Sequence, residues 1–167
     1  MKTIYKTLAI FFTISMIAFA QVPYAPWAKL ASDAPKDISS RKYPVPTKEE
    51  VGIIPYPGAV ISSVSAPVKD TTKYNQEVLP FVILVSTDDP SRVVAFYKKY
   101  LTSEKGWTYS EEFKTFVKGP TSKALTGFVP TVSIRDESGD NFDLSYVDQS
   151  LRKSLRSRIE ITYNPKK

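Results

Sequence analysis

The sequence contains no cysteine and no histidine. The lack of cysteine excludes disulfide bonds, thiolate nucleophiles, iron–sulfur clusters and Cys-ligated zinc sites. The lack of histidine excludes a Ser-His-Asp triad, an imidazole general base and the most common transition-metal ligand. With only six glycines, the chain also has no Gly-rich phosphate-binding loop. Carboxylates, lysines, tyrosines and hydroxyl groups are what remains for chemistry, and we expect no cofactor and no metal.

Residues 1–20 have the pattern of a secretory signal peptide. Lys2 and Lys6 precede an apolar stretch, residues 8–20, that ends in Ala-Phe-Ala. This stretch is shorter than a bilayer-spanning helix requires, and no later segment is apolar for 18 residues. We therefore predict an exported protein, periplasmic or secreted, with no transmembrane segment in its mature form. No lipid anchor is expected, because no cysteine follows the cleavage site.

Residues 21–52 are predicted to form a proline-rich extended leader. Seven of the 13 prolines lie between residues 21 and 57, where no apolar period is visible. Proline fixes φ and removes a hydrogen-bond donor, so this composition favours extended conformations. The leader is interpreted as a semi-rigid spacer, and the alternative is a docking peptide around residues 23–27.

Residues 53–163 are predicted to form one α+β domain, followed by a short basic tail at 164–167. Apolar runs and alternating patterns predict an antiparallel sheet of five to six strands with one amphipathic helix on one face. A predicted hairpin turn at 137–141 leads to an alternating segment at 142–146. The other segments predicted to be extended are 59–68, 79–87, 107–117, 132–134 and 159–163.

The helix is predicted over residues 90–104. Asp89 is a suitable N-cap, Pro90 fits the first helical position, and Gly106 suits a left-handed stop. At 100° per residue the apolar side chains gather on one side, which predicts that the helix lies on the sheet. These side chains are Val93, Val94, Phe96, Tyr97, Tyr100 and Leu101.

The segment from Pro57-Gly58-Ala59 to Gly106-Trp107 resembles small exported bacterial proteins of uncharacterised function. In those proteins a Pro-Gly-Ala entry precedes two strands, and a helix with the pattern Val-x-x-Phe-Tyr-x-x-x-Leu ends in Gly-Trp. The resemblance covers about residues 53–107, roughly half of the domain. It implies a shared packing arrangement and carries neither catalytic residues nor a function.

Two acidic groups are candidates for chemistry. The cluster Asp136, Glu137, Asp140, Asp143 and Asp148 could form a weak cation site, but its spacing does not fit an EF-hand and favours a solvated hairpin tip. Asp88 and Asp89 could form a catalytic pair, but their position at a helix entry favours capping. Two Ser-x-x-Lys matches, at 39–42 and 150–153, are interpreted as chance because no partner motif accompanies them.

The net charge is concentrated at the C-terminal end. Residues 151–167 carry a net charge of +5, whereas residues 21–150 carry −1. Arg152, Lys153, Arg156 and Arg158 therefore form a candidate patch for anionic surfaces, with a solvated sheet edge as the alternative. A helical turn from Asp148 would direct Leu151 and Leu155 inward.

These observations predict a non-catalytic binding or accessory module of the cell envelope or extracellular space. Its partner would be an envelope or extracellular protein or an anionic polymer, and we expect no nucleic acid as a ligand. The alternative is a small hydrolase or lyase that uses carboxylates, lysines and tyrosines.

Overall fold

The computed structural model describes residues 45–69, 77–136 and 152–165. Along the chain, their helices and strands are α1 (Lys48–Val51), β1 (Val60–Ser65), β2 (Val68–Lys69), β3 (Glu77–Val78), β4 (Phe81–Ser86), α2 (Pro90–Tyr100), β5 (Trp107–Ser110), β6 (Thr115–Lys118), β7 (Thr131–Asp136) and β8 (Ser157–Thr162). Two short 3-10 turns, η2 (Ser103–Lys105) and η3 (Thr121–Lys123), follow α2 and β6. Among these elements no helix is long and apolar enough to cross a membrane.

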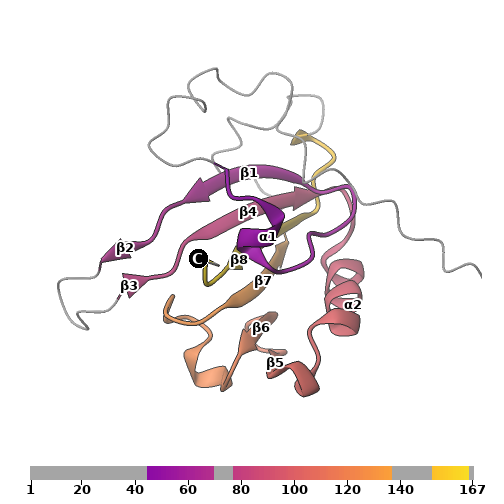
Figure 1. Cartoon of the computed structure of the whole chain (residues 1–167). Coiled ribbons are helices and arrows are strands. Elements are labelled where there is room, and N and C mark those ends of the chain that lie inside the picture. Colours follow the sequence, from indigo (N-terminus) through magenta and orange to yellow (C-terminus); the bar gives the residue numbers. More distant parts are fainter. Residues whose placement is uncertain (1–44, 70–76, 137–151, 166–167) are drawn as a thin grey trace, which may run out of the picture.

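Six strands form one antiparallel sheet in the order β1-β4-β8-β7-β6-β5, as Figure 1 shows. The short strands β2 and β3 pair with each other beyond the ends of β1 and β4. Helix α2 packs against β7 and β8 near the middle of the sheet. This arrangement confirms the predicted α+β class. The segment predicted at 142–146 lies outside the described residues.

One face of the sheet is apolar along its whole width. Cross-strand partners share a face, so the register places two apolar rows side by side. The first row runs through Ile61, Leu84, Ile159 and Ile134. The second runs through Val82, Ile161, Val132, Phe116 and Tyr109. Both rows belong to the main hydrophobic core, with Tyr109 packing at its edge.

Strand β4 has buried side chains on both of its faces, as the continuous apolar run at 79–87 predicts. The strand predicted over 59–68 is instead divided into β1 and β2. Pro67 lies between them, where its missing N–H cannot contribute to a ladder.

Helix α2 is shorter than predicted. Val93 and Tyr97 are fully buried on its inner face, but the helix ends at Tyr100 and not at residue 104. Leu101 leaves helical geometry, and the chain then forms η2, which Gly106 ends with a φ of +77°. The Lys105 ammonium donates a hydrogen bond to the Tyr100 carbonyl at 3.2 Å, which satisfies one of the last carbonyls of α2.

The segment 45–59 forms a second cover over the apolar face. Helix α1 begins with a capping box in which the Glu50 amide donates to Thr47 Oγ1 and the Thr47 amide donates to Glu50 Oε2. Val51, Ile53 and Tyr56 lie in the main hydrophobic core. Residues 45–52, which the composition assigns to the leader, are therefore part of the folded domain.

A hydrogen bond fastens this second cover to the start of α2. The Tyr56 hydroxyl donates to Asp88 Oδ2 at 2.6 Å, and the Arg92 guanidinium donates to Asp88 Oδ1 at 3.0 Å. Burial, followed by the Asp88 hydrogen bond and charge, raises the pKa of Tyr56 from 10.0 to about 12. The neighbouring core residue Tyr97 differs, because its buried hydroxyl lies near the Tyr56 backbone but forms no hydrogen bond of normal geometry in the part of the chain that the structure describes.

We predict different effects of Tyr56→Phe and Tyr97→Phe on the free energy of unfolding, measured by urea denaturation. Tyr56→Phe removes a hydrogen bond to a charged acceptor and should cost about 1–2 kcal/mol. Tyr97→Phe removes only an unpaired buried hydroxyl and should leave the free energy unchanged or raise it by up to about 1 kcal/mol. A loss in Tyr97→Phe as large as that in Tyr56→Phe would contradict this account.

The effect of Tyr56→Phe should also depend on pH. The folded-state pKa of Tyr56 is raised above its ordinary value. The hydroxyl therefore makes its full contribution to the free energy of unfolding below pH 10, and this contribution is lost between pH 10.0 and about 12. The difference in unfolding free energy between wild type and Tyr56→Phe should therefore be constant up to pH 10 and shrink above it. A difference that persists unchanged at the highest pH would show that the Asp88 bond does not carry it.

Candidate functional site

The basic residues of the candidate patch lie in two different environments. Arg152, Lys153 and Arg156 are exposed in the segment that leads into β8. Arg158 lies within β8, where its guanidinium is 3.0 Å from Glu160 Oε2 and its side chain is only 13% exposed. The structure thus separates Arg158 from the exposed three, for which anionic-surface binding stays a prediction. Leu155 is buried against Val85, and Leu151 lies outside the described residues.

Only one member of the acidic cluster lies in the described part of the chain. Asp136 is exposed at the end of β7, and residues 137–148 lie outside that part. Within the described residues, no group of three or more acidic side chains is placed to hold a metal ion.

The pair at the start of α2 has a structural role. Asp88 accepts hydrogen bonds from Tyr56 and Arg92, and its backbone carbonyl accepts one from the Ser157 hydroxyl. Asp89 occupies the N-cap, but its side chain makes no capping hydrogen bond, contrary to expectation. Asp88 therefore links the start of α2 to the segment 45–59 and to β8.

The sheet face opposite α2 is rich in hydroxyl groups. One row across this face consists of Ile83, Glu160, Ser133, Thr115 and Ser110. Thr115 and Ser133 share a hydrogen bond of 2.8 Å between their hydroxyl oxygens. These two hydroxyls pair with each other, and Ser110 Oγ accepts a hydrogen bond from the Phe113 amide.

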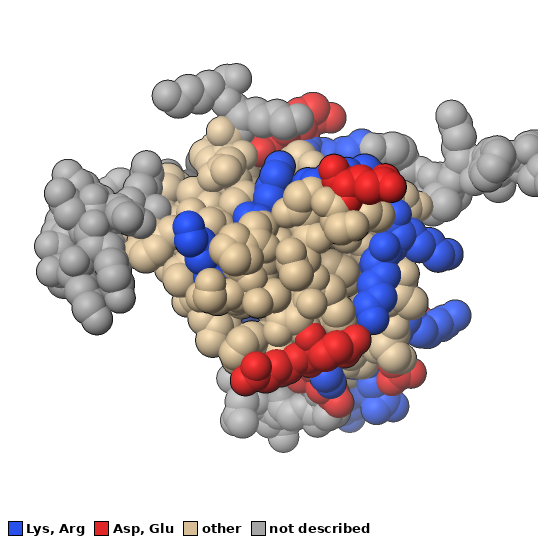
Figure 2. Space-filling view, turned by 90° about the horizontal axis from the view of Figure 1, so that it is seen from below, with Lys and Arg blue, Asp and Glu red and all other residues tan. Residues whose placement is uncertain are grey.

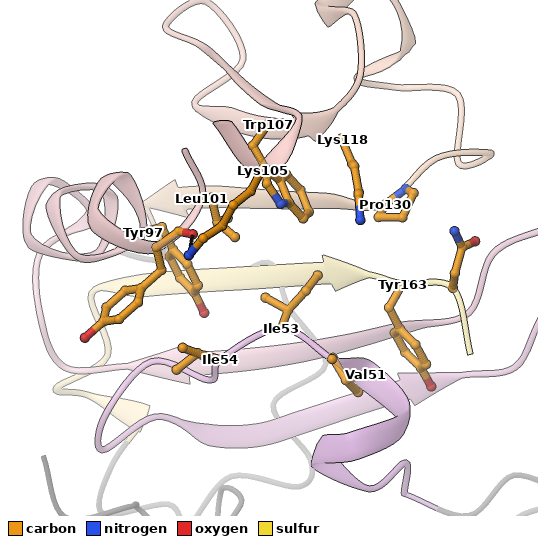
Figure 3. A pocket seen from close by; sticks show the side chains of 13 residues that line it. Val51, Ile53, Ile54, Tyr97, Leu101, Lys105, Trp107, Lys118, Pro130 and Tyr163 are labelled. Carbon is orange, nitrogen blue, oxygen red and sulfur yellow. Dashed lines mark hydrogen bonds between the residues drawn. The ribbon is translucent and has the colours of Figure 1, made fainter. Parts of the chain in front are cut away.

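A pocket of about 360 Å³ lies on the other face, between the segment 45–59, the end of α2 and the sheet (Figure 3). The apolar face of the sheet is covered by helix α2 and, separately, by the segment 45–59. The pocket lies where these two covers do not meet. The residues that line it are Val51, Gly52, Ile53, Ile54, Tyr97, Tyr100, Leu101, Lys105, Trp107, Lys118, Pro130, Tyr163 and Asn164.

The walls of this pocket are mostly apolar and come from well-packed elements. Val51 and Ile53 form one wall, and Tyr97 and Leu101 form the α2 side. Trp107 from β5 closes the pocket opposite Ile53 (Figure 3). Ile54 lines the pocket with 41% of its surface exposed, so the pocket has an apolar surface open to solvent.

The charged side chains that line the pocket are both lysines. Lys105 and Lys118 reach into it from the side of β5 and β6 (Figure 3), and none of the described lining residues is a carboxylate. Seen from below, the middle of the molecule carries few charged side chains, with most Lys and Arg side chains along the right-hand edge and Asp and Glu side chains above and below the middle (Figure 2). The pocket therefore combines apolar walls with positive charge.

Two tyrosines of the pocket, Tyr97 and Tyr163, stay protonated at neutral pH. Burial raises the pKa of Tyr97, an effect that the nearby Tyr56 backbone only partly offsets. Burial, with a smaller contribution from the Glu50 charge, raises the pKa of Tyr163. These hydroxyls can donate hydrogen bonds, but they do not supply a base near neutral pH.

The sequence pattern predicts an extended segment at 107–117, which includes Trp107 but stops before Lys118, and nothing in it brings the two residues together. In the structure these two residues face each other across β5 and β6. Comparisons of the chain with protein-family models, with curated proteins and with solved structures find no match.

Proposed function

We propose that this chain is an exported, non-catalytic binding protein whose folded domain takes up a small apolar ligand in the pocket between the segment 45–59 and α2. The observation that carries this proposal is a concave site with apolar walls and few polar groups, which is the usual character of small-molecule sites. The predicted signal peptide supplies the location outside the cytoplasm.

The size of the pocket limits the class of ligand. Its volume of about 360 Å³ lies near the lower end of the range of roughly 300–1,000 Å³ for ligand pockets. A single medium-length alkyl chain suits this volume better than a two-chain lipid does. Trp107 and Ile53 would contact such a chain from opposite sides (Figure 3).

The ionisable groups of the pocket favour binding over catalysis. A hydrolase or lyase built on carboxylates needs such a group beside the substrate, and the described lining residues include none. The raised pKa of Tyr97 and of Tyr163 keeps both hydroxyls protonated. Lysines and protonated tyrosines can hold a ligand in place by donating hydrogen bonds.

The two tryptophans of the chain make this proposal directly testable. Trp107 lines the pocket and Trp27 lies in the leader, so Trp27→Phe leaves the pocket residue as the only tryptophan. We predict that decanol added to Trp27→Phe shifts or quenches Trp107 fluorescence in a saturable manner. An unchanged Trp107 spectrum across a decanol and decanoate series would overturn the proposed function.

A matched pair of variants locates the binding. Ile54 lines the pocket, whereas Leu125 is 68% exposed and does not line it. Ile54→Ser in the Trp27→Phe background should weaken decanol binding about threefold to tenfold, because it removes apolar contact area. Leu125→Ser should leave the affinity unchanged, and equal losses in both variants would point to nonspecific surface binding.

A further inference from the structure

We infer that the ligand is an anionic single-chain amphiphile, such as a medium-chain carboxylate, whose head group is held by Lys118 with help from Lys105. This inference rests on the proposed ligand-binding function of the pocket and adds the charge of the ligand to it. It follows from the position, the available donors and the charge surroundings of the two lysines.

Lys118 stands at the apolar wall of the pocket. It is the last residue of β6 and lies directly opposite Trp107 in the register of β5 and β6. The two side chains therefore share a face of the sheet, and that of Lys118 reaches into the pocket beside the indole (Figure 3). A lysine can lay its methylene stem along apolar surface while its ammonium stays at the polar end.

The ammonium of Lys118 has no carboxylate to neutralise it among the described residues. Ion pairs of 3.0–3.1 Å among the described residues join Arg92 with Asp88, Lys98 with Glu111 and Arg158 with Glu160. Glu111, a carboxylate just beyond β5, is thus already paired with Lys98 at 3.1 Å. A positive charge at an apolar wall favours a ligand that brings a negative charge with its apolar chain.

Lys105 supplies further donors from the neighbouring turn. Its ammonium donates to the Tyr100 carbonyl at 3.2 Å, which uses one of its three N–H groups. This bond fixes the side chain against the end of α2 and leaves two donors for a ligand. The negative end of the α2 dipole partly offsets the charge of Lys105, so Lys118 is expected to contribute more to affinity.

The test compares ligands of one chain length and different head groups. In the Trp27→Phe background at neutral pH, decanoate should bind about fivefold to tenfold more tightly than decanol. Decyltrimethylammonium should bind more weakly than either. Raising the salt concentration to about 1 M should reduce the preference for decanoate without changing the affinity for decanol.

Substitution of single lysines tests whether the preference for decanoate over decanol comes from the lysines of the pocket. Lys118→Gln should lower the affinity for decanoate more than the affinity for decanol and so remove most of the decanoate preference, and Lys105→Gln should remove a smaller part. Lys99→Gln is the matched control, because Lys99 is an exposed lysine of α2 that does not line the pocket. It removes the same net charge from the protein and should leave the preference intact.

The outcomes separate the two proposals. Equal affinities for decanoate and decanol, or a preference that Lys118→Gln and Lys99→Gln lower equally, would overturn the anionic head group while the pocket remains a ligand site. Binding of none of the three amphiphiles would overturn the proposed function itself. A decanoate preference that Lys118→Gln removes and Lys99→Gln retains would support both.

Discussion

The central physical constraint in this domain is the width of its apolar sheet face. Neighbouring strands lie about 4.8 Å apart, so six strands span about 24 Å, whereas a helix with its side chains is only about 10 Å wide. Helix α2 therefore lies mainly over β7 and β8, and its side chains extend this cover as far as Phe116 of β6 and Tyr109 of β5, but it makes few contacts with the strands on the other side of β8. Exposing the remaining apolar side chains would cost about 25 cal/mol per Å². The segment 45–59 packs over the same face and buries part of this apolar surface.

The two covers are joined at one end and separated at the other. At the start of α2, the Tyr56 hydroxyl donates to Asp88 and brings the segment 45–59 against the helix. At the end of α2, the helix stops at Tyr100, and the Lys105 ammonium binds its last carbonyl. The pocket lies at this second end. The pocket thus forms because α2 and the segment 45–59 together do not cover the whole width of the sheet. Its two lysines come from η2 and β6, which border the uncovered part.

The fold could be predicted from the sequence because its signals are local. The apolar run before residue 87 and the Asp-Pro entry at 89–90 identify β4 and α2 without tertiary information. The packing of the segment 45–59 on the sheet could not be predicted from composition. The prolines around residues 44–57 are typical of an extended leader outside the folded domain. One local signal was present, namely the Thr47-Lys-Glu-Glu50 pattern of a capping box, which forms as the pattern predicts.

The candidate site could not be predicted from the sequence because it depends on register. Lys118 joins the pocket only because β5 and β6 pair so that it faces Trp107, and a shift of one residue would turn its side chain to the other face of the sheet. Similarly, the four basic residues near the C-terminus look equivalent in sequence. Strand β8 nevertheless places Arg158 beside Glu160 and leaves the other three exposed.

Residue-by-residue mapping of ligand contacts is the most direct test of the claim that the gap between the covers is the binding site. In amide-resolved NMR spectra of the full chain titrated with decanoate, the largest shift changes should fall on the Trp107 indole and on the amides of Gly52, Ile53 and Lys118. Changes centred on Arg152, Lys153 and Arg156, or on the hydroxyl-rich face around Ser133, would contradict the account.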